Sequence, residues 1–230
     1  MKLVHSSISE NGNAGWDGKA KAGDQTGKEV CVRSWYSKPW DIMLRYPDKS
    51  IATKAAAAAV KLANSNLVGY DQSERNTLYK ALKAVNFDVD AYIKTGKKTE
   101  SDCSSFVYAV FACFIPGMRS DNNAPVTSTM RNLYKKWGFE LFTGSEYLNG
   151  NNLINGDILV KENAHTAMAT TEPVTMIDIP TYSADVSAAI DTIARDVIRG
   201  KWGNGNDRKE KLYVAIQTRV NELWRVGVHS

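Results

Sequence analysis

The stretch Thr99-Glu-Ser-Asp-Cys-Ser-Ser-Phe-Val107 marks the start of a helix that we expect to be buried. Its polar residues are typical of helix N-termini, and the apolar run Phe106-Val-Tyr-Ala-Val-Phe-Ala-Cys-Phe114 follows without a break. Cys103 therefore lies in the first helical turn, where backbone N–H groups have no intrahelical partner. The positive end of the helix dipole favours a thiolate at this position, so Cys103 is a candidate nucleophile.

A free cysteine is more often a small core residue than a nucleophile. Cys113, which has apolar neighbours on the same predicted helix, fits that structural role. Cys103 fits it poorly, because Asp102 and Ser104 on either side of it are polar. The rest of the chain must then supply a base for Cys103 if it is to act as a nucleophile.

The composition is that of an ordinary globular protein, large enough for a medium domain and a small one. The chain has 230 residues, of which 43% are hydrophobic and 23% are charged. Its net charge of +4 comes from scattered Lys and Arg residues, which suits an anionic partner such as a bacterial wall better than nucleic acid. Three widely spaced cysteines favour reduced thiols, with a Cys31–Cys113 bridge as the alternative.

The sequence predicts neither a signal peptide nor a membrane-spanning segment. The opening residues Met1-Lys-Leu-Val-His-Ser-Ser7 are too polar for a signal peptide, and no apolar run reaches membrane-spanning length. No His, Cys and Asp residues are grouped at the spacing of metal ligands. We therefore expect no membrane insertion, no metal and no cofactor.

Apolar periodicity predicts helices and strands along the first three quarters of the chain. Residues 29–36 and 40–46 alternate apolar and polar side chains around Ser37-Lys-Pro39, which predicts a β-hairpin. Asp48 or Ser50 is expected to cap an alanine-rich helix over residues 48–66. The remaining predictions are helices at 73–85, capped by Ser73, and at 127–137, ended by Gly138, and strands at 139–142, 157–161 and 164–169.

The pattern changes after residue 172, which divides the chain into two predicted domains. Proline-containing turns bracket a linker at residues 173–184. An apolar stripe with helical spacing then begins, and residues 185–230 are predicted to form a small three-helix bundle near the lower size limit for independent folding. Residues 1–172 would form the catalytic domain, with mixed α+β content.

A cysteine nucleophile needs a base, which is most often histidine. The chain has three histidines, His5, His165 and His229. His229 is the penultimate residue, where chains usually fray. A lone histidine on a strand is more often structural than catalytic. Paired with a cysteine at a helix start, however, His165 on the predicted strand 164–169 becomes the best candidate for the base.

Three successive motifs resemble those of NlpC/P60-type papain-like cysteine peptidases, which cut bacterial peptidoglycan. They are Ser101-Asp-Cys-Ser-Ser-Phe-Val107, Gly156-Asp-Ile-Leu-Val160 and Ala164-His-Thr-Ala-Met168. Their order and spacing make the resemblance much more specific than any one motif would be. It implies a papain-like α+β catalytic domain, in which Cys103 is the nucleophile and His165 the base.

The same resemblance implies roles for the residues around Cys103. Asp102 and Ser104 would flank the site and help to bind a substrate amine. Backbone N–H groups at the helix start would stabilise an oxyanion, and the reaction would be acyl transfer.

One departure from the family pattern suggests a circularly permuted domain. The family usually carries a further polar residue, commonly His, on a strand after the base strand, but here the linker begins too early for that strand. Leu3-Val-His-Ser-Ser-Ile-Ser9 has the pattern of the missing segment, and chain ends commonly lie close together. We hypothesise that the N-terminal strand and hairpin complete the sheet and that His5 orients His165. Gln25 and Glu29 are alternatives, and His5 could instead be a solvated terminal residue.

The C-terminal segment carries a second resemblance, to the CW_7 cell-wall-binding repeat of phage lytic enzymes. The run Gly200-Lys-Trp-Gly-Asn-Gly205 is its most distinctive part, although the Gly-Tyr-Asp segment usual between the second and third helices is missing. The resemblance implies binding to the wall, with Trp202 offering a flat face to a sugar unless it packs in the bundle core. The candidate wall-binding residues are Trp202, Gly203, Asn204 and Arg208.

Together these features predict a phage or prophage endolysin, a cysteine peptidoglycan hydrolase made without a signal peptide and released to act on the cell wall. The first choice of bond is that between D-glutamate and the diamino acid of the stem peptide. N-acetylmuramoyl-L-alanine amidase activity is the near alternative, because the same Cys-His pair serves both bonds. Two further alternatives are a cysteine deamidase or transglutaminase-like effector and a non-catalytic wall-binding protein.

Overall fold

A computed structural model describes residues 1–9, 12, 29–119 and 123–170, and in the C-terminal part residues 192–193, 195–197, 199–203, 211–212, 214–215 and 218. The chain divides into two compact units, Met1–Val174 and Thr175–Ser230. The predicted linker at 173–184 and the residues Gln25, Asn204 and Arg208 lie outside the described part.

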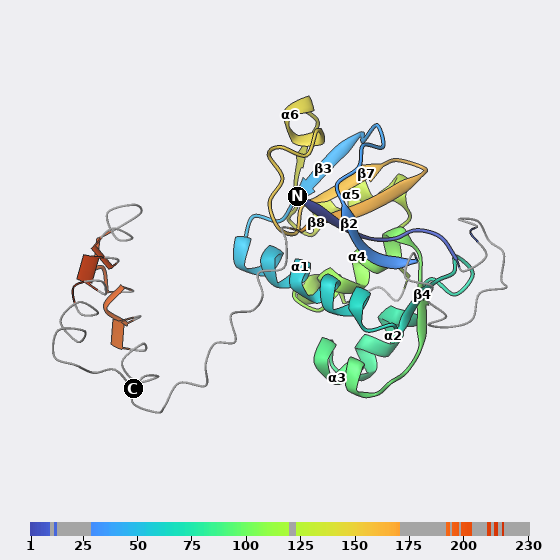
Figure 1. Cartoon of the computed structure of the whole chain (residues 1–230), viewed down its shortest axis with the longest axis horizontal. Helices are drawn as coiled ribbons and strands as arrows, with labels where there is room; N and C mark the ends of the chain where they lie inside the picture. The colour runs from blue at the N-terminus through green and yellow to red at the C-terminus, as the bar shows by residue number, and fades with distance from the viewer. Residues whose placement is uncertain are drawn as a thin grey trace. The chain divides into compact units, whose positions relative to one another are not determined.

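In its described part, the first unit is built on a six-stranded antiparallel sheet whose strands are not in sequence order (Figure 1). The strand order is β2-β1-β8-β7-β3-β6, so the first strand of the chain lies beside the last described one. The strands are β1 (Lys2–Ser6), β2 (Val30–Ser34), β3 (Ile42–Arg45), β6 (Glu140–Phe142), β7 (Ile158–Lys161) and β8 (His165–Thr170).

Helices pack against this sheet, and a second, two-stranded parallel sheet adjoins them. α1 and α4 contact the main sheet directly, and every residue of α4 is buried. The helices are α1 (Lys49–Asn64), α2 (Thr77–Ala84), α3 (Val89–Lys94), α4 (Cys103–Ala112), α5 (Thr127–Lys136) and α6 (Ser145–Leu148), with a 3₁₀ turn at Pro116–Met118. The small sheet pairs β4 (Val68–Tyr70) with β5 (Thr99–Ser101).

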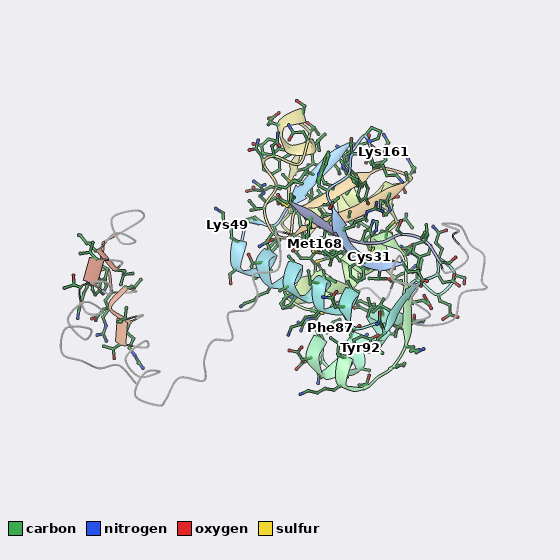
Figure 2. All side chains as sticks on the ribbon, viewed as in Figure 1. Cys31, Lys49, Phe87, Tyr92, Lys161 and Met168 are labelled. Carbon is green, nitrogen blue, oxygen red and sulfur yellow. The ribbon has the colours of Figure 1, made fainter. Side chains whose placement is uncertain are left out.

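Alternation along the strands gives the main sheet two apolar faces. The larger cluster joins the helices to one face and includes Val4 of β1, Ile42 of β3 and Met168 of β8. Met168 is labelled in Figure 2. The smaller cluster includes Leu3 of β1 and Ala167 of β8 and contains Trp40. Both faces of the sheet are therefore covered, and β8 is buried along its whole length.

The mixed α+β class is confirmed, and so are several local predictions. Asp48 caps α1, since its Oδ1 accepts hydrogen bonds from the backbone N–H groups of Ser50 and Ile51 at 2.8 and 3.1 Å. α5 ends before Gly138, whose φ of +88° suits a residue without a Cβ. The cap predicted at Ser73 is wrong, because α2 begins at Thr77 and the Ser73 hydroxyl donates to Asp71 at 2.6 Å instead.

The hairpin predicted from residues 29–36 and 40–46 is also wrong, although both strands exist. β2 pairs with β1, whereas β3 pairs with β6 and β7. Residues 35–41 therefore cross from one side of the sheet to the other, past β1, β8 and β7. Alternating side chains indicate a strand but not its partner, which is why proximity in sequence misled the prediction.

The Gly-Asp motif before β7 has a structural role in this fold. Gly156 has φ +85°, and a Cβ there would lie 2.5 Å from the backbone oxygen of Ala52 in α1. The buried carboxylate of Asp157 accepts hydrogen bonds from Nε and Nη2 of Arg45 at 2.8 and 2.6 Å. The motif thus fixes the entry of β7 against α1 and β3. Among the described residues, no helix has the length and apolar character needed to cross a membrane.

The hydroxyl of Tyr134 offers a test of this core. It is fully buried and has no hydrogen-bond partner among the described residues, which is unfavourable for a polar group. We expect Tyr134→Phe to raise the free energy of unfolding by about 1 kcal/mol, measured by urea denaturation. Tyr92→Phe is the matched control, because the Tyr92 hydroxyl lies 2.7 Å from Thr99 Oγ1 and its removal should lower stability. Equal effects of the two variants would contradict the packing described.

Candidate active site

Cys103 is the first residue of α4, and a complete capping box holds the start of that helix. Oδ1 of Asp102 accepts the backbone N–H of Ser105 at 2.7 Å, and Ser105 Oγ accepts the backbone N–H of Asp102 at 2.8 Å. The polar residues that predicted a helix start therefore do cap it. They place the thiol where the free N–H groups of the first turn converge.

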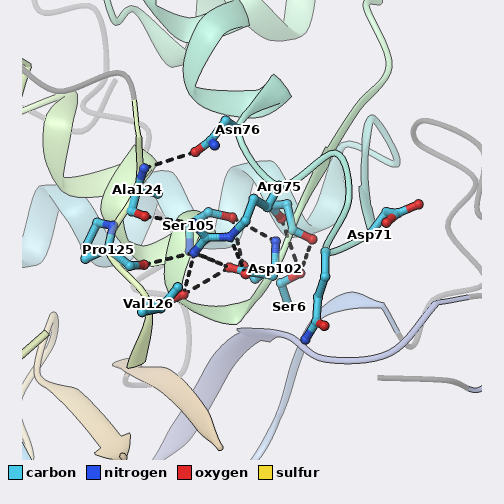
Figure 3. Close-up of polar contacts among 12 residues, drawn as sticks. Ser6, Asp71, Arg75, Asn76, Asp102, Ser105, Ala124, Pro125 and Val126 are labelled. Carbon is cyan, nitrogen blue, oxygen red and sulfur yellow. Dashed lines mark hydrogen bonds and ion pairs between the residues drawn. The ribbon is translucent and has the colours of Figure 1, made fainter. Parts of the chain in front are cut away.

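A buried arginine that the sequence analysis missed supports this cap (Figure 3). Arg75 donates to both carboxylate oxygens of Asp102, through Nε at 2.6 Å and Nη2 at 3.2 Å. The same guanidinium donates to the carbonyl oxygens of Ala124 and Pro125 at 2.7 and 2.9 Å, and to Ser104 Oγ at 2.9 Å. Arg75 thus ties the start of α4 to the segment that leads into α5.

The residues predicted to bind a substrate amine belong to this internal network. Asp102 is bound by Arg75 and caps α4, and Ser104 Oγ donates to Asp102 Oδ1 at 3.1 Å. Both residues are buried, with 6% and 2% of their surfaces exposed. The observed contacts of Asp102 and Ser104 are therefore structural, and their contact with a substrate stays a prediction.

The predicted base, His165, is the first residue of β8 and lies in a group of aromatic side chains. Its Nε2 is 2.9 Å from the hydroxyl oxygen of Tyr36 and 3.4 Å from Nδ1 of His5. The Tyr36 hydroxyl is also 2.8 Å from Nδ1 of His5, so one phenol contacts both histidines. The ring of Trp40 stacks beside His165 at a centroid distance of 6.1 Å and an interplanar angle of 26°.

The crossing segment and β1 bring these groups together. β1 pairs with β8 through Val4 opposite Met168, which places His5 on the strand next to His165. Residues 35–41 cross the sheet and carry Tyr36 and Trp40 to the same point. The expectation that the N-terminal strand joins the sheet beside the base strand is confirmed.

α4, which begins with Cys103, packs against β8, the strand that begins with His165. The backbone N–H groups of Thr166 on that strand and of Ser104 each act to lower the pKa of the Cys103 thiol. Burial raises the pKa of Tyr36 and of Tyr70, and the negative charge that Cys103 would carry as a thiolate contributes to both increases. Cys103 therefore lies beside the strand that begins with the candidate base His165.

Burial makes this site electrically neutral at rest. Burial and the charge of Asp102 raise the pKa of Cys103 to about 12, despite the two backbone N–H groups at the sulfur. Burial and nearby positive charges, including those of Lys38 and Arg33, lower the pKa of His165 to about 3 and that of His5 to about 4. The thiolate expected from the helix dipole is thus outweighed by desolvation. The Cys103 thiol and the His165 imidazole are therefore both neutral at pH 7.

The sequence contains little that identifies Tyr36 or Arg75. Tyr36 lies in a stretch whose strands pair elsewhere than predicted, and Arg75 lies in a polar run with no motif. Within the described ranges, no three or more His, Cys, Asp or Glu side chains are grouped to hold a metal ion.

In the second unit, the described part of the predicted wall-binding residues forms a turn. Trp202 and Gly203 are half-buried, and the backbone N–H of Gly203 donates to the carbonyl of Gly200 at 3.1 Å. Lys201 Nζ lies 2.8 Å from Asp196 Oδ1.

The role of Arg75 can be tested by removing its charge. Arg75→Met leaves the buried carboxylate of Asp102 without its partner, so we expect the free energy of unfolding to fall by about 3–5 kcal/mol in urea denaturation. Lys61→Met is the control, because the Lys61–Asp90 pair is largely exposed and should contribute less than about 1 kcal/mol. A similar small loss in both variants would refute the proposed importance of this ion pair.

Comparison with known proteins identifies both units. Residues 3–176 match the family model of the endolysin-like domain (ELLD), and residues 191–224 match the model of the CW_7 repeat. No curated protein and no solved structure matches the chain. The combination of an endolysin-like domain with a CW_7 cell-wall repeat supports a peptidoglycan hydrolase. Because the first match covers most of the sequence, the chain belongs to the endolysin-like domain family.

Proposed function

We propose that this peptidoglycan hydrolase cleaves an amide bond of the stem peptide by acyl transfer, with Cys103 as nucleophile and His165 as base. The observation that carries the proposal is that α4, which begins with Cys103, packs against β8, which begins with His165. The backbone N–H of Thr166, the residue after His165, lowers the pKa of the Cys103 thiol, which supports the closeness of the thiol to the strand that bears the imidazole. Both groups are neutral at rest, which suits general-base activation rather than a preformed thiolate.

The contacts of His165 indicate which ring nitrogen would take the proton. Nε2 faces Tyr36 and His5, which leaves Nδ1 for the thiol. In the first step the thiol proton passes to Nδ1 while the sulfur attacks the amide carbonyl, and a tetrahedral oxyanion forms. Backbone N–H groups at the start of α4 are suited to stabilise this oxyanion. The imidazolium then protonates the leaving amine, and the C–N bond breaks to give a thioester.

The second half of the reaction returns the enzyme to its first state. Neutral His165 removes a proton from a water molecule, and the oxygen attacks the thioester carbonyl. Collapse of the second tetrahedral intermediate releases the carboxylic acid, and the thiolate of Cys103 recovers its proton from the imidazolium. A buried site suits this chemistry because charge separates only while substrate is bound.

We also propose that the catalytic domain is a circularly permuted relative of the NlpC/P60 domain. In that family the residue that orients the base comes from a strand after the base strand. Here β1 runs antiparallel to β8 and carries His5 to within 3.4 Å of His165. Joining the ends of such a domain and opening it elsewhere preserves its contacts, which is why permutation is structurally feasible.

For the bond that is cut, we propose the γ-D-glutamyl-diamino acid bond, with the N-acetylmuramoyl-L-alanine bond as the alternative. Both are amides that a Cys-His pair can cleave. The CW_7 repeat, with Trp202, Gly203, Asn204 and Arg208, would hold the enzyme on the wall. Trp202 offers an aromatic face and Arg208 a guanidinium that can pair with a carboxylate.

Clearing of purified bacterial walls tests the assignment. We expect Cys103→Ala and His165→Ala to lower the rate of turbidity loss by at least about 100-fold, because each removes a reacting group. Cys113→Ala is the matched control, since this thiol also lies on the α4 chain segment but donates to the carbonyl of Ala109, and it should retain activity. Wall clearing by folded Cys103→Ala would refute the mechanism. Mass spectrometry of the digest distinguishes the two bonds by the new amino termini.

The lowered pKa values of the two histidines predict how stability depends on pH. Both groups have an ordinary pKa of 6.5, and in the folded state the pKa is about 3 for His165 and about 4 for His5. The unfolded chain therefore binds more protons below pH 6.5, and folding stability should fall as the pH falls from 6.5 toward 4. Each histidine contributes a slope of up to about 1.4 kcal/mol per pH unit.

Urea denaturation at pH 4 to 7 measures this slope. Replacement of both residues, as in His5→Asn with His165→Gln, should leave a shallower pH dependence than that of the wild type. An unchanged slope would mean that these two histidines do not account for the loss of stability in acid.

A further inference from the structure

His5 and His165 are linked through the hydroxyl of Tyr36 and not by a direct hydrogen bond of ordinary length. Their nearest nitrogens are 3.4 Å apart, beyond the usual range for a hydrogen bond between ring nitrogens. The Tyr36 hydroxyl oxygen is closer to both rings than they are to each other, at 2.9 Å from Nε2 of His165 and 2.8 Å from Nδ1 of His5. The two short contacts form a chain from one imidazole through the phenol to the other.

The proton of Tyr36 links the tautomers of the two histidines. A hydroxyl has one proton, so it can donate to one ring nitrogen and accept from the other. If Tyr36 donates to Nδ1 of His5, then Nε2 of His165 must carry a proton and donate to Tyr36. Nδ1 of neutral His165 is then unprotonated and can accept the thiol proton of Cys103. In the opposite arrangement Nδ1 of His165 is protonated and cannot act as a base.

The surroundings of His5 favour the first arrangement. His5 is buried, and the lowered pKa keeps its ring neutral, so Nδ1 can remain an acceptor. Burial also raises the pKa of Tyr36, which keeps the phenol protonated. Nε2 of His5 has no hydrogen-bond partner among the described residues, so no other group sets the tautomer of this ring.

We propose that Tyr36 is a positioning residue: its hydroxyl donates a hydrogen bond to Nδ1 of His5 and accepts one from Nε2–H of His165. This arrangement fixes the His165 tautomer that can deprotonate Cys103. This inference rests on the proposed Cys-His function and adds a role for Tyr36 in it. His5 acts through the phenol and not by direct contact. During catalysis the imidazolium of His165 donates through Nε2 to the Tyr36 oxygen, and Tyr36 continues to donate to His5, so no proton has to move between them.

The packing of Tyr36 fits such a role. The ring lies 5.5 Å from that of His5 and 6.4 Å from that of His165, measured between centroids. Trp40 packs against both Tyr36 and His165, at 5.7 and 6.1 Å. Its Nε1 donates to the backbone carbonyl of Tyr36 at 3.4 Å, which holds the crossing segment in place. The hydroxyl is therefore fixed by a segment that has no β-sheet pairing of its own.

Nitrogen NMR of the full chain with ¹⁵N-labelled histidine tests the tautomer without reference to activity. In the wild type we expect His165 to be protonated at Nε2 and His5 also at Nε2. In Tyr36→Phe the His165 ring loses the hydroxyl oxygen that accepts from its Nε2–H, so His165 should become a mixture of the two tautomers. His5→Leu should give the same mixture, whereas His5→Asn, which keeps an acceptor oxygen near the place of Nδ1, should restore the wild-type state.

Wall-clearing rates give an independent measurement. Tyr36→Phe and His5→Leu should each lower kcat about ten-fold or more with little change in KM, because the wrong tautomer removes the base but not the binding surface. The double variant should be no slower than either single variant, since both break the same chain. Tyr134→Phe controls for loss of a buried phenol hydroxyl and should keep the wild-type rate.

Three results would overturn the relay. One is a wild-type tautomer of His165 in Tyr36→Phe. Another is full activity of folded His5→Leu, and the third is additive losses in the double variant, which would mean that the two residues act separately. Failure of the Cys-His mechanism is a different result, because it would leave folded Cys103→Ala active while the tautomers stayed as described. Thermal unfolding of each variant separates these outcomes from loss of the fold.

Discussion

The pairing of β1 with β8 is the constraint on which the candidate site depends. It joins residues near the start of the chain to the strand that begins with His165, and it leaves His5 and the phenol of Tyr36 at the same end of the sheet. Without this pairing β8 would lose one neighbour and its backbone N–H and C=O groups would lack partners on that side. The imidazole of His165 would also lose the 3.4 Å contact that its Nε2 makes with Nδ1 of His5.

A second constraint acts on the thiol from the helical side. The guanidinium of Arg75 neutralises Asp102, and Asp102 in turn caps the helix that presents Cys103. The ion pair is buried, so its two charges offset each other where neither would be stable alone. Burial raises the pKa of the Cys103 thiol, and the charge of Asp102 raises it further. The fold thus places a cysteine at a helix start, where a thiolate is usually favoured, and keeps it protonated.

Local patterns in the sequence predicted the parts of the site that local structure controls. The cap residue Asp102 and the apolar run after Cys103 predicted the start of α4, and alternation predicted the strand of His165. Long-range pairing was harder to predict, because two strands adjacent in sequence looked like a hairpin yet joined different neighbours. Tyr36 was missed for this reason, since its position depends on where the crossing segment runs. The placement of β1 was predicted only because the sequence after β8 has no segment like the strand that usually carries the orienting residue, and a segment with the same pattern occurs at residues 3–9.

The order of strands in the sheet also affects how this domain is made. β1 spans Lys2–Ser6 and β8 spans His165–Thr170, so β1 is synthesised long before β8 and the two strands cannot pair until nearly all of the unit Met1–Val174 has been made. Until then β1 has only β2 as a neighbour in the sheet, and His165, the first residue of β8, is absent. The candidate site draws on both β1 and β8, so it can be completed only late in the synthesis of this domain. Pairing of two strands that lie so far apart in sequence is expected to be slow, because a long loop must close before the strands can meet.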